Sequence, residues 1–237
     1  MKEIVDFIKS QVLKSKTKGI VLGLSGGIDS AVVAVLSKRA IGAKNLHCYY
    51  LPMTIKNKDY DRDHIEKLCE RFDLSYQTET IVNPVLSIIG NSGNLSKESM
   101  GNIKARVRMT ILYKHANNLN CLVIGTTNKT ELMIGYFTKY GDGACDFEPI
   151  AHLYKHQIKE LAKELDIPNE IIDKLPSAGL WEGQTDEDEL GISYDKLDEI
   201  LCKMYNNDLN EFTKKDIDHV KSLVSKSYHK RHTPPTL

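Results

Sequence analysis

Apolar residues recur along this chain in two alternating patterns, one typical of helices and the other typical of strands. The short strand-like runs, rich in aliphatic residues, lie at residues 19–24, 46–51, 75–81 and 121–124. The stretches with helical spacing in the first half of the chain lie at residues 4–13, 31–36, 59–72 and 102–117. Strands that alternate with helices predict β-α-β units, and therefore a parallel sheet with helices on both faces.

The regular alternation breaks at residues 177–191. Further helical patterns lie at residues 155–165, 194–204 and 214–225. Residues 87–99 are rich in glycine, asparagine and serine and are predicted as a loop. Residues 177–191 combine glycines with acidic residues, and we predict a second, mobile loop there. The whole pattern indicates a single Rossmann-like α/β domain of three layers over residues 1–237, with a basic C-terminal tail.

Composition excludes several classes of protein. Hydrophobic residues make up 41% and charged residues 27%, which is ordinary for a globular protein. The 32 basic residues balance the 32 acidic ones, which argues against a partner such as nucleic acid or an anionic membrane. No apolar run approaches the roughly 18 residues of a membrane span, and the first residues are too charged for a secretory signal. The five cysteines are scattered without metal-ligand spacing, so we expect a cytoplasmic protein with reduced thiols.

The most informative segment is residues 23–30, Gly-Leu-Ser-Gly-Gly-Ile-Asp-Ser, between a predicted strand and a predicted helix. It can be a tight turn in which Asp29 or Ser30 caps the helix. It can also be a nucleophile elbow, since residues 23–27 match G-x-S-x-G, although only one strand precedes Ser25. The third interpretation is a nucleotide loop whose amides and helix N-terminus bind phosphate. A carboxylate such as Asp29 would repel phosphate unless a divalent cation lies between them, which suggests Mg²⁺.

Residues 25–30, Ser-Gly-Gly-Ile-Asp-Ser, resemble the pyrophosphate loop of the N-type ATP pyrophosphatases. Further segments resemble one family in that group, the ammonia-dependent NAD synthetases; they are residues 102–109, 125–131, 135–143, 183–191 and 229–231. The resemblance implies ATP-dependent amidation of deamido-NAD to NAD with ammonia, the final step of NAD biosynthesis. It also implies an acyl-adenylate intermediate, release of AMP and pyrophosphate, and a homodimer.

The resemblance also implies roles for individual residues. Asp29, Glu131 and Lys155 would form the catalytic set, with Mg²⁺ held by the two carboxylates. The residues implied in ATP binding are Gly23, Leu24, Ser25, Gly26, Gly27, Ile28, Asp29, Ser30, Thr126, Lys155 and Ser177. The residues implied in deamido-NAD binding are Arg106, Lys139, Asp146, His229 and Lys230. Independently of the resemblance, Thr126 ends a predicted strand, so it should lie at the same edge of the sheet as Ser25.

These residues also have ordinary explanations. Glu131 can be an exposed helix acid, Lys155 a surface lysine and Arg106 a solvated arginine. The basic tail can be a disordered terminus, and residues 177–191 can be a solvated acidic loop rather than a lid that excludes water.

Two other functions are open. A non-catalytic nucleotide-binding module is disfavoured because both metal carboxylates are present, and a tRNA-modifying pyrophosphatase is disfavoured by the neutral net charge. Only 22 residues precede the loop at residue 23, so we expect ammonia rather than glutamine as the nitrogen source.

Overall fold

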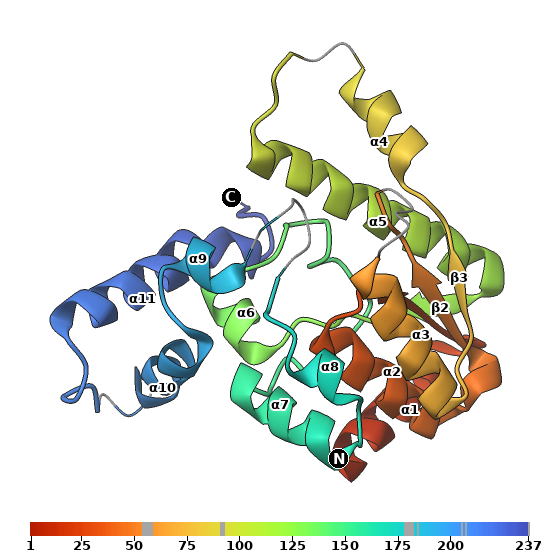
Figure 1. Ribbon diagram of the computed structural model, residues 1–237, viewed down its shortest axis with the longest axis horizontal. Helices are drawn as coiled ribbons and strands as arrows, with labels where there is room; N and C mark the ends of the chain where they lie inside the picture. The colour runs from red at the N-terminus through yellow and green to blue at the C-terminus, as the bar shows by residue number, and fades with distance from the viewer. Residues whose placement is uncertain are drawn as a thin grey trace.

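The protein is built around a four-stranded sheet in which every strand pairing is parallel (Figure 1). The computed structural model describes residues 1–53, 59–90, 93–177, 183, 185–204, 206 and 208–236. The strands are β1 (Gly19–Leu24), β2 (Leu46–Tyr50), β3 (Tyr76–Thr78) and β4 (Cys121–Val123), in the order β3-β2-β1-β4. Ile20 of β1 lies opposite Leu46 on one side and Leu122 on the other. The predicted parallel sheet is confirmed.

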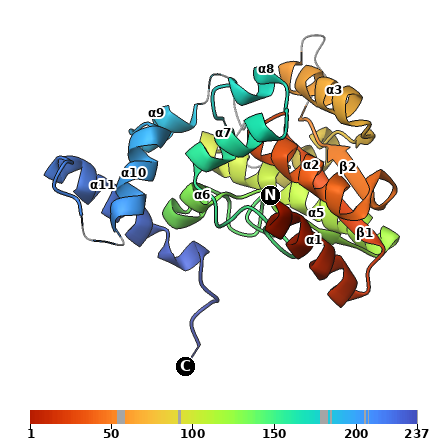
Figure 2. The ribbon, with the colours of Figure 1, turned by 90° about the horizontal axis from the view of Figure 1, so that it is seen from below.

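Helices cover both faces of this sheet, because successive side chains of a strand point to opposite faces. Ile20, Leu22 and Leu24 of β1 belong to a core shared with α1 (Lys2–Ser15) and α2 (Ile28–Ile41). Val21, between them, belongs to a second core shared with α5 (Lys97–Leu119). The result is the expected arrangement of three layers, with α2 buried along most of its length (Figure 2).

A third core lies beside these layers, in a group of helices that extends to one side of the molecule in both views (Figure 1, Figure 2). Its helices are α6 (Lys129–Ile134), α9 (Asp186–Leu190), α10 (Tyr194–Met204) and α11 (Lys214–Lys226). The remaining elements are α3 (Tyr60–Phe72), α4 (Val82–Ile89), α7 (Lys155–Glu164), α8 (Asn169–Ile172), and the short turns η1 (Ala43–Asn45) and η2 (Tyr228–Lys230). None of the helices in the described ranges is long and apolar enough to cross a membrane. The single domain stays a prediction.

Several predicted boundaries were wrong. The loop predicted at 87–99 is partly helical, because α4 continues to Ile89 and α5 already begins at Lys97. Ser96 caps α5 by accepting a hydrogen bond from the Ser99 amide at 3.1 Å, which starts the helix before its apolar pattern does. The third strand is shorter than predicted, since β3 lies at the edge of the sheet and pairs only with β2.

Candidate functional site

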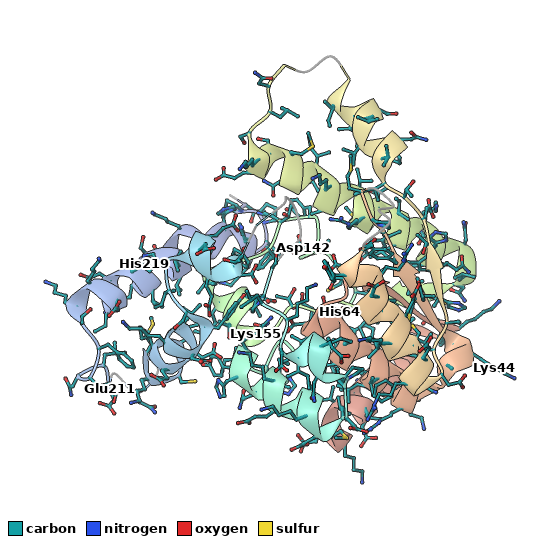
Figure 3. The ribbon with its side chains drawn as sticks, viewed as in Figure 1. Lys44, His64, Asp142, Lys155, Glu211 and His219 are labelled. Atoms are coloured by element: carbon teal, nitrogen blue, oxygen red, sulfur yellow. The ribbon has the colours of Figure 1, made fainter. Side chains whose placement is uncertain are left out.

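A large cavity lies where the parallel strands end, the edge at which open α/β sheets bind ligands. Its volume is about 1220 Å³. Ser25 and Asp29, from the loop between β1 and α2, line it together with Glu131 and Lys155. His64, Asp142 and Lys155, which come from different segments of the chain, lie around the middle of the molecule in the view with side chains (Figure 3).

The loop between β1 and α2 is held by its own hydroxyl groups. The Ser25 hydroxyl lies 3.1 Å from the Ser30 hydroxyl and accepts a hydrogen bond from the Gly27 amide at 3.2 Å. The Ser30 hydroxyl donates to the Gly27 carbonyl at 3.0 Å. In the described part of the chain no histidine or carboxylate pairs with Ser25, so the geometry does not support a nucleophile elbow.

Gly26 has a backbone conformation that other residues rarely adopt, and we expect Gly26→Ala to be destabilising. Its φ is +71°, and an added Cβ would lie 2.7 Å from the backbone of Asp61. Left-handed strain alone costs roughly 1–2 kcal/mol, and the contact with Asp61 adds to it. Urea unfolding should therefore show a loss of at least about 2 kcal/mol.

Gly191→Ala is the matched control, because Gly191 has φ +67° and its added Cβ would meet nothing closer than 3.8 Å. Equal losses in the two variants would contradict a tightly packed loop.

Three charged side chains from three helices meet beside the loop. The Lys155 ammonium lies 2.6 Å from Oδ2 of Asp29 and 3.2 Å from Oε1 of Glu131. The amide group of Asn128 donates to Oδ1 of Asp29 at 3.0 Å. The two carboxylates keep 16% of their side-chain exposure and Lys155 keeps 4%, so the cluster is largely shielded from water.

Local sequence fixes the positions of Glu131 and Lys155. Asn128 and Glu131 form a capping box at the start of α6, in which each side chain accepts the other's backbone amide, at 3.0 and 3.3 Å. The Lys155 amide donates to the Thr130 hydroxyl at 3.0 Å, and that hydroxyl donates to the buried Asp198 of α10. The helices that carry Glu131 and Lys155 are therefore joined through Thr130.

Burial and neighbouring charge shift the pKa values of Glu131 and Lys155. Burial raises the pKa of Glu131, Lys155 lowers it, and Asp29 raises it again, with a net shift upward. Burial alone would lower the pKa of Lys155, but Asp29 and Glu131 hold it above its ordinary value. A carboxylate with a raised pKa beside a second carboxylate is a site where a divalent cation would be stabilising.

The two carboxylates, Asp29 and Glu131, suit Mg²⁺ better than a metal ion whose ligands all come from the protein. Among the described residues no group of three or more His, Cys, Asp or Glu side chains could hold a metal ion. Mg²⁺ commonly uses one or two carboxylates and takes its other ligands from substrate phosphates and water. Asp29 and Glu131, two carboxylates beside the loop between β1 and α2, match that pattern.

The structure brings most of the predicted ATP-site residues to one cavity. Those that line it are Gly23, Leu24, Ser25, Gly27, Ile28, Asp29, Ser30, Thr126, Lys155 and Ser177. Gly26 is not among the lining residues and instead packs against Asp61. The predicted mobile loop lies partly outside the described residues, since 178–182 and 184 are not described.

Only one of the five residues predicted to bind deamido-NAD lines this cavity. Lys230 lines the cavity and donates to the carbonyls of Gly135 and Phe137, each at 2.7 Å. Asp146 does not line the cavity, and its carboxylate accepts a hydrogen bond from the Val123 amide at 2.7 Å.

The other three predicted deamido-NAD residues, Arg106, Lys139 and His229, are joined by hydrogen bonds and do not line the cavity. Arg106 donates to the Lys139 carbonyl at 3.3 Å, and the Lys139 ammonium donates to the His229 carbonyl at 2.7 Å.

Sequence reasoning missed three features of the cavity. Asn128 holds both Glu131 and Asp29, and its N-x-x-E capping spacing was the signal that could have found it. Lys174 lines the cavity beside the loop, but no local signal marks it. Asp186 accepts hydrogen bonds from the hydroxyls of Tyr194 and Tyr136, at 3.0 and 3.1 Å, and lies in the acidic run that was interpreted only as a loop.

Known proteins match nearly the whole chain. Residues 1–234 match the profile of the family described as NAD synthase. The NH(3)-dependent NAD(+) synthetases of Thermococcus kodakarensis and Archaeoglobus fulgidus are 42% and 44% identical to this chain. These alignments cover 98% and 99% of this chain, and 93% and 94% of those proteins.

Two solved structures share the fold over the same length. The NMN synthetase from Francisella tularensis has a TM-score of 0.89 at 37% identity. The NH3-dependent NAD synthetase from Campylobacter jejuni, solved in complex with the nitrate ion, has a TM-score of 0.87 at 38% identity. Each comparison covers 100% of this chain and 96% of the other. The parallel sheet and its flanking helices are thus those of solved synthetases.

Proposed function

The chain belongs to the NAD synthase family, and on that basis we infer that it is an NH3-dependent NAD synthetase, a carbon–nitrogen ligase. It amidates deamido-NAD to NAD with ammonia and uses ATP. An amide does not form from a carboxylate and ammonia at a useful rate, because oxide is a poor leaving group. ATP supplies a better one.

The reaction we propose has two displacements. A carboxylate oxygen of the nicotinate attacks the α-phosphorus of ATP, and the bond to the bridging oxygen breaks to release pyrophosphate. The nitrogen of ammonia then attacks the acyl carbon, loses a proton, and displaces AMP. No side chain has to act as a covalent nucleophile, so the protein's contribution is positioning and charge stabilisation.

In this proposal the loop amides and the Ser25 and Ser30 hydroxyls hold the phosphates of ATP, as a helix N-terminus is suited to do. Asp29 and Glu131 would hold Mg²⁺, which neutralises charge on the departing pyrophosphate when it is bound. Lys155, already within 3.2 Å of both carboxylates, would contact the phosphates from the same side. A lid formed by residues 177–191 stays a prediction; its role would be to keep water from the adenylate.

One observation carries the proposal: the loop, both carboxylates and Lys155 line one cavity at the carboxyl edge of the sheet. The direct test is incubation of the protein with ATP, Mg²⁺, ammonium and deamido-NAD, with NAD, AMP and pyrophosphate quantified together. The proposal requires the three products in equal amounts. Pyrophosphate without NAD would contradict the amidation step.

A second candidate substrate is the mononucleotide, nicotinate mononucleotide. The observation that favours it is the likeness to the NMN synthetase from Francisella tularensis, which extends over 100% of this chain. Of the five residues implied in dinucleotide binding, only Lys230 lines the cavity of the single chain. The two substrates should be compared by kcat/KM at equal ATP. A higher value for deamido-NAD supports the main proposal, and a higher value for the mononucleotide supports the second.

We expect ammonium, and not glutamine, to support turnover of this chain. A glutamine-using site needs an activated cysteine nucleophile. Burial raises the pKa of Cys48, Cys69, Cys121 and Cys145 instead of lowering it, so these thiols stay protonated. Activity with ammonium should rise with pH as more ammonia is unprotonated, until another group titrates.

The measurement is NAD formation with either nitrogen source, in a preparation shown to be free of glutaminase. Comparable rates with glutamine would contradict the assignment.

We also propose a homodimer, with deamido-NAD bound near the interface. Arg106, Lys139 and His229 are joined by hydrogen bonds but lie outside the cavity lining of one chain. This supports a deamido-NAD site that a second copy of the chain completes. Tyr140 and Tyr228, which are next to Lys139 and His229 in the chain, are 56% and 60% exposed. Light scattering after gel filtration distinguishes dimer from monomer, and a monomer at assay concentration would contradict the proposal.

A further inference from the structure

Lys159 and Lys174 line the cavity in addition to Lys155, and neither belongs to the proposed ATP-binding set. Lys159 lies on α7, and Lys174 follows α8 by two residues. Both α7 and α8 pack against α2, the helix that follows the loop between β1 and α2. Lys159 and Lys174 are therefore carried by segments that pack on the helix that follows the loop.

Lys174 is in direct contact with the loop. Its ammonium lies 3.4 Å from the Gly26 carbonyl and 2.6 Å from Oδ1 of Asp61. The side chains of Lys174 and Asp61 are 24% and 40% exposed, and ion pairs with that much solvent are weak. His64 donates from Nδ1 to the same Gly26 carbonyl at 3.3 Å. An anion with several charges in the loop can therefore compete with Asp61 for the Lys174 ammonium.

Lys159 lies four residues after Lys155 on α7, so the two side chains share one face of the helix. In the described part of the chain, no side chain or carbonyl forms a hydrogen bond or ion pair with the Lys159 ammonium. Lys155, in contrast, is held by Asp29 and Glu131. Lys159 is thus a half-buried cation that faces the cavity with its charge available to a ligand.

The charges that line the cavity favour such cations. Among the described residues, eight acidic side chains line it against six basic ones, so without Lys159 and Lys174 the lining would be still more negative before any phosphate enters. Because ATP adds further negative charge, we propose that Lys159 and Lys174 bind its outer phosphates and hold pyrophosphate after it leaves. This inference rests on the proposed function, since it assigns residues to the pyrophosphate that the reaction releases.

The test is calorimetric titration of the full chain with inorganic pyrophosphate and, separately, with AMP, in one Mg²⁺ buffer. Lys159→Met and Lys174→Met should each weaken pyrophosphate binding about tenfold, as expected for one charge-assisted hydrogen bond, and leave AMP within about twofold. Lys159→Arg and Lys174→Arg keep the charge and should bind pyrophosphate nearly as the wild type does, which also controls for folding.

Two further variants separate phosphate binding from a structural ion pair. Asp61→Asn removes the partner of Lys174 but frees its ammonium, so pyrophosphate affinity should be kept or increased. Lys67→Met breaks a comparable pair between α3 and α8, with Glu170 at 2.5 Å, and Lys67 does not line the cavity. It should bind pyrophosphate as the wild type does.

Equal weakening by Asp61→Asn and Lys174→Met would overturn the inference, because it would mean that the ion pair itself matters. Wild-type pyrophosphate affinity in both methionine variants would also overturn it. Loss of AMP and pyrophosphate binding to the same extent would do the same. In each case NAD formation by the wild type would show that the proposed function stands; absence of NAD with the wild type would instead contradict the proposed function.

Discussion

Asp29→Asn and Glu131→Gln are each expected to abolish pyrophosphate release while the fold remains intact. Each change replaces an anionic ligand of the proposed Mg²⁺ site by a neutral amide of the same shape. Changes to residues behind a metal ligand already cost 10–100-fold, so loss of a direct ligand should exceed about 100-fold. Neither change should unfold the protein, since the amide can still accept from Lys155, which lies 2.6 Å from Asp29 and 3.2 Å from Glu131.

The measurement is pyrophosphate release at saturating ATP, together with a titration of Mg²⁺ against the ATP-bound protein. Glu170→Gln is the matched control, because Glu170 is a half-exposed acid that pairs with Lys67 outside the cavity. Turnover near that of the wild type in both Asp29→Asn and Glu131→Gln would contradict the metal assignment. A loss of turnover with unchanged Mg²⁺ binding would contradict it as well.

The sequence was sufficient for the features that depend on short segments. Residues 25–30 combine glycines, hydroxyls and a carboxylate at the start of a helix, and most of them line the cavity as expected; their phosphate role stays a prediction. The parallel sheet was also predictable, since strands that alternate with helices allow few other arrangements. Thr126 and Ser25 at one edge follow from that topology.

Contacts between distant segments could not be predicted in this way. Lys174 and Gly26 are separated by 148 positions and meet only because α8 packs on α2. Asp198 joins α6 to α7 through Thr130, and nothing near Asp198 in the sequence marks it as more than a polar residue of an amphipathic helix. The resemblance gave Lys155 a phosphate role, but its position between two carboxylates is a property of the packed structure.

Lys155→Met is expected to lower both activity and stability, and the stability change should depend on Mg²⁺. Removing one partner of a buried ion pair costs roughly 3–5 kcal/mol, because the remaining charge is left unpaired. Here two carboxylates would face each other without the ammonium that lies 2.6 and 3.2 Å from them. Without metal the unfolding free energy should fall by about 3 kcal/mol near neutral pH, and Mg²⁺ should stabilise the variant more than the wild type.

The pH dependence of that loss identifies the group responsible. Lys155 is the neighbour that lowers the pKa of Glu131, so its removal should raise this pKa further above the ordinary value of 4.5. A carboxyl whose pKa is raised in the folded state is ionised more readily when unfolded, so stability falls as the pH rises above 4.5. In the folded wild type the pKa of Glu131 is already raised to about 8, so the wild type and the variant lose stability in parallel below that pH and diverge above it. Urea unfolding in the presence of a chelator should therefore show a larger deficit at about pH 9.5 than at about pH 7. The double variant Lys155→Met/Glu131→Gln should lose this dependence, since its amide does not titrate.

Lys163→Met, on the exposed side of the same helix, should behave as the wild type at both pH values. A deficit in Lys155→Met that is the same at both pH values and unaffected by Mg²⁺ would mean that the lysine supports packing rather than the charge of the two carboxylates.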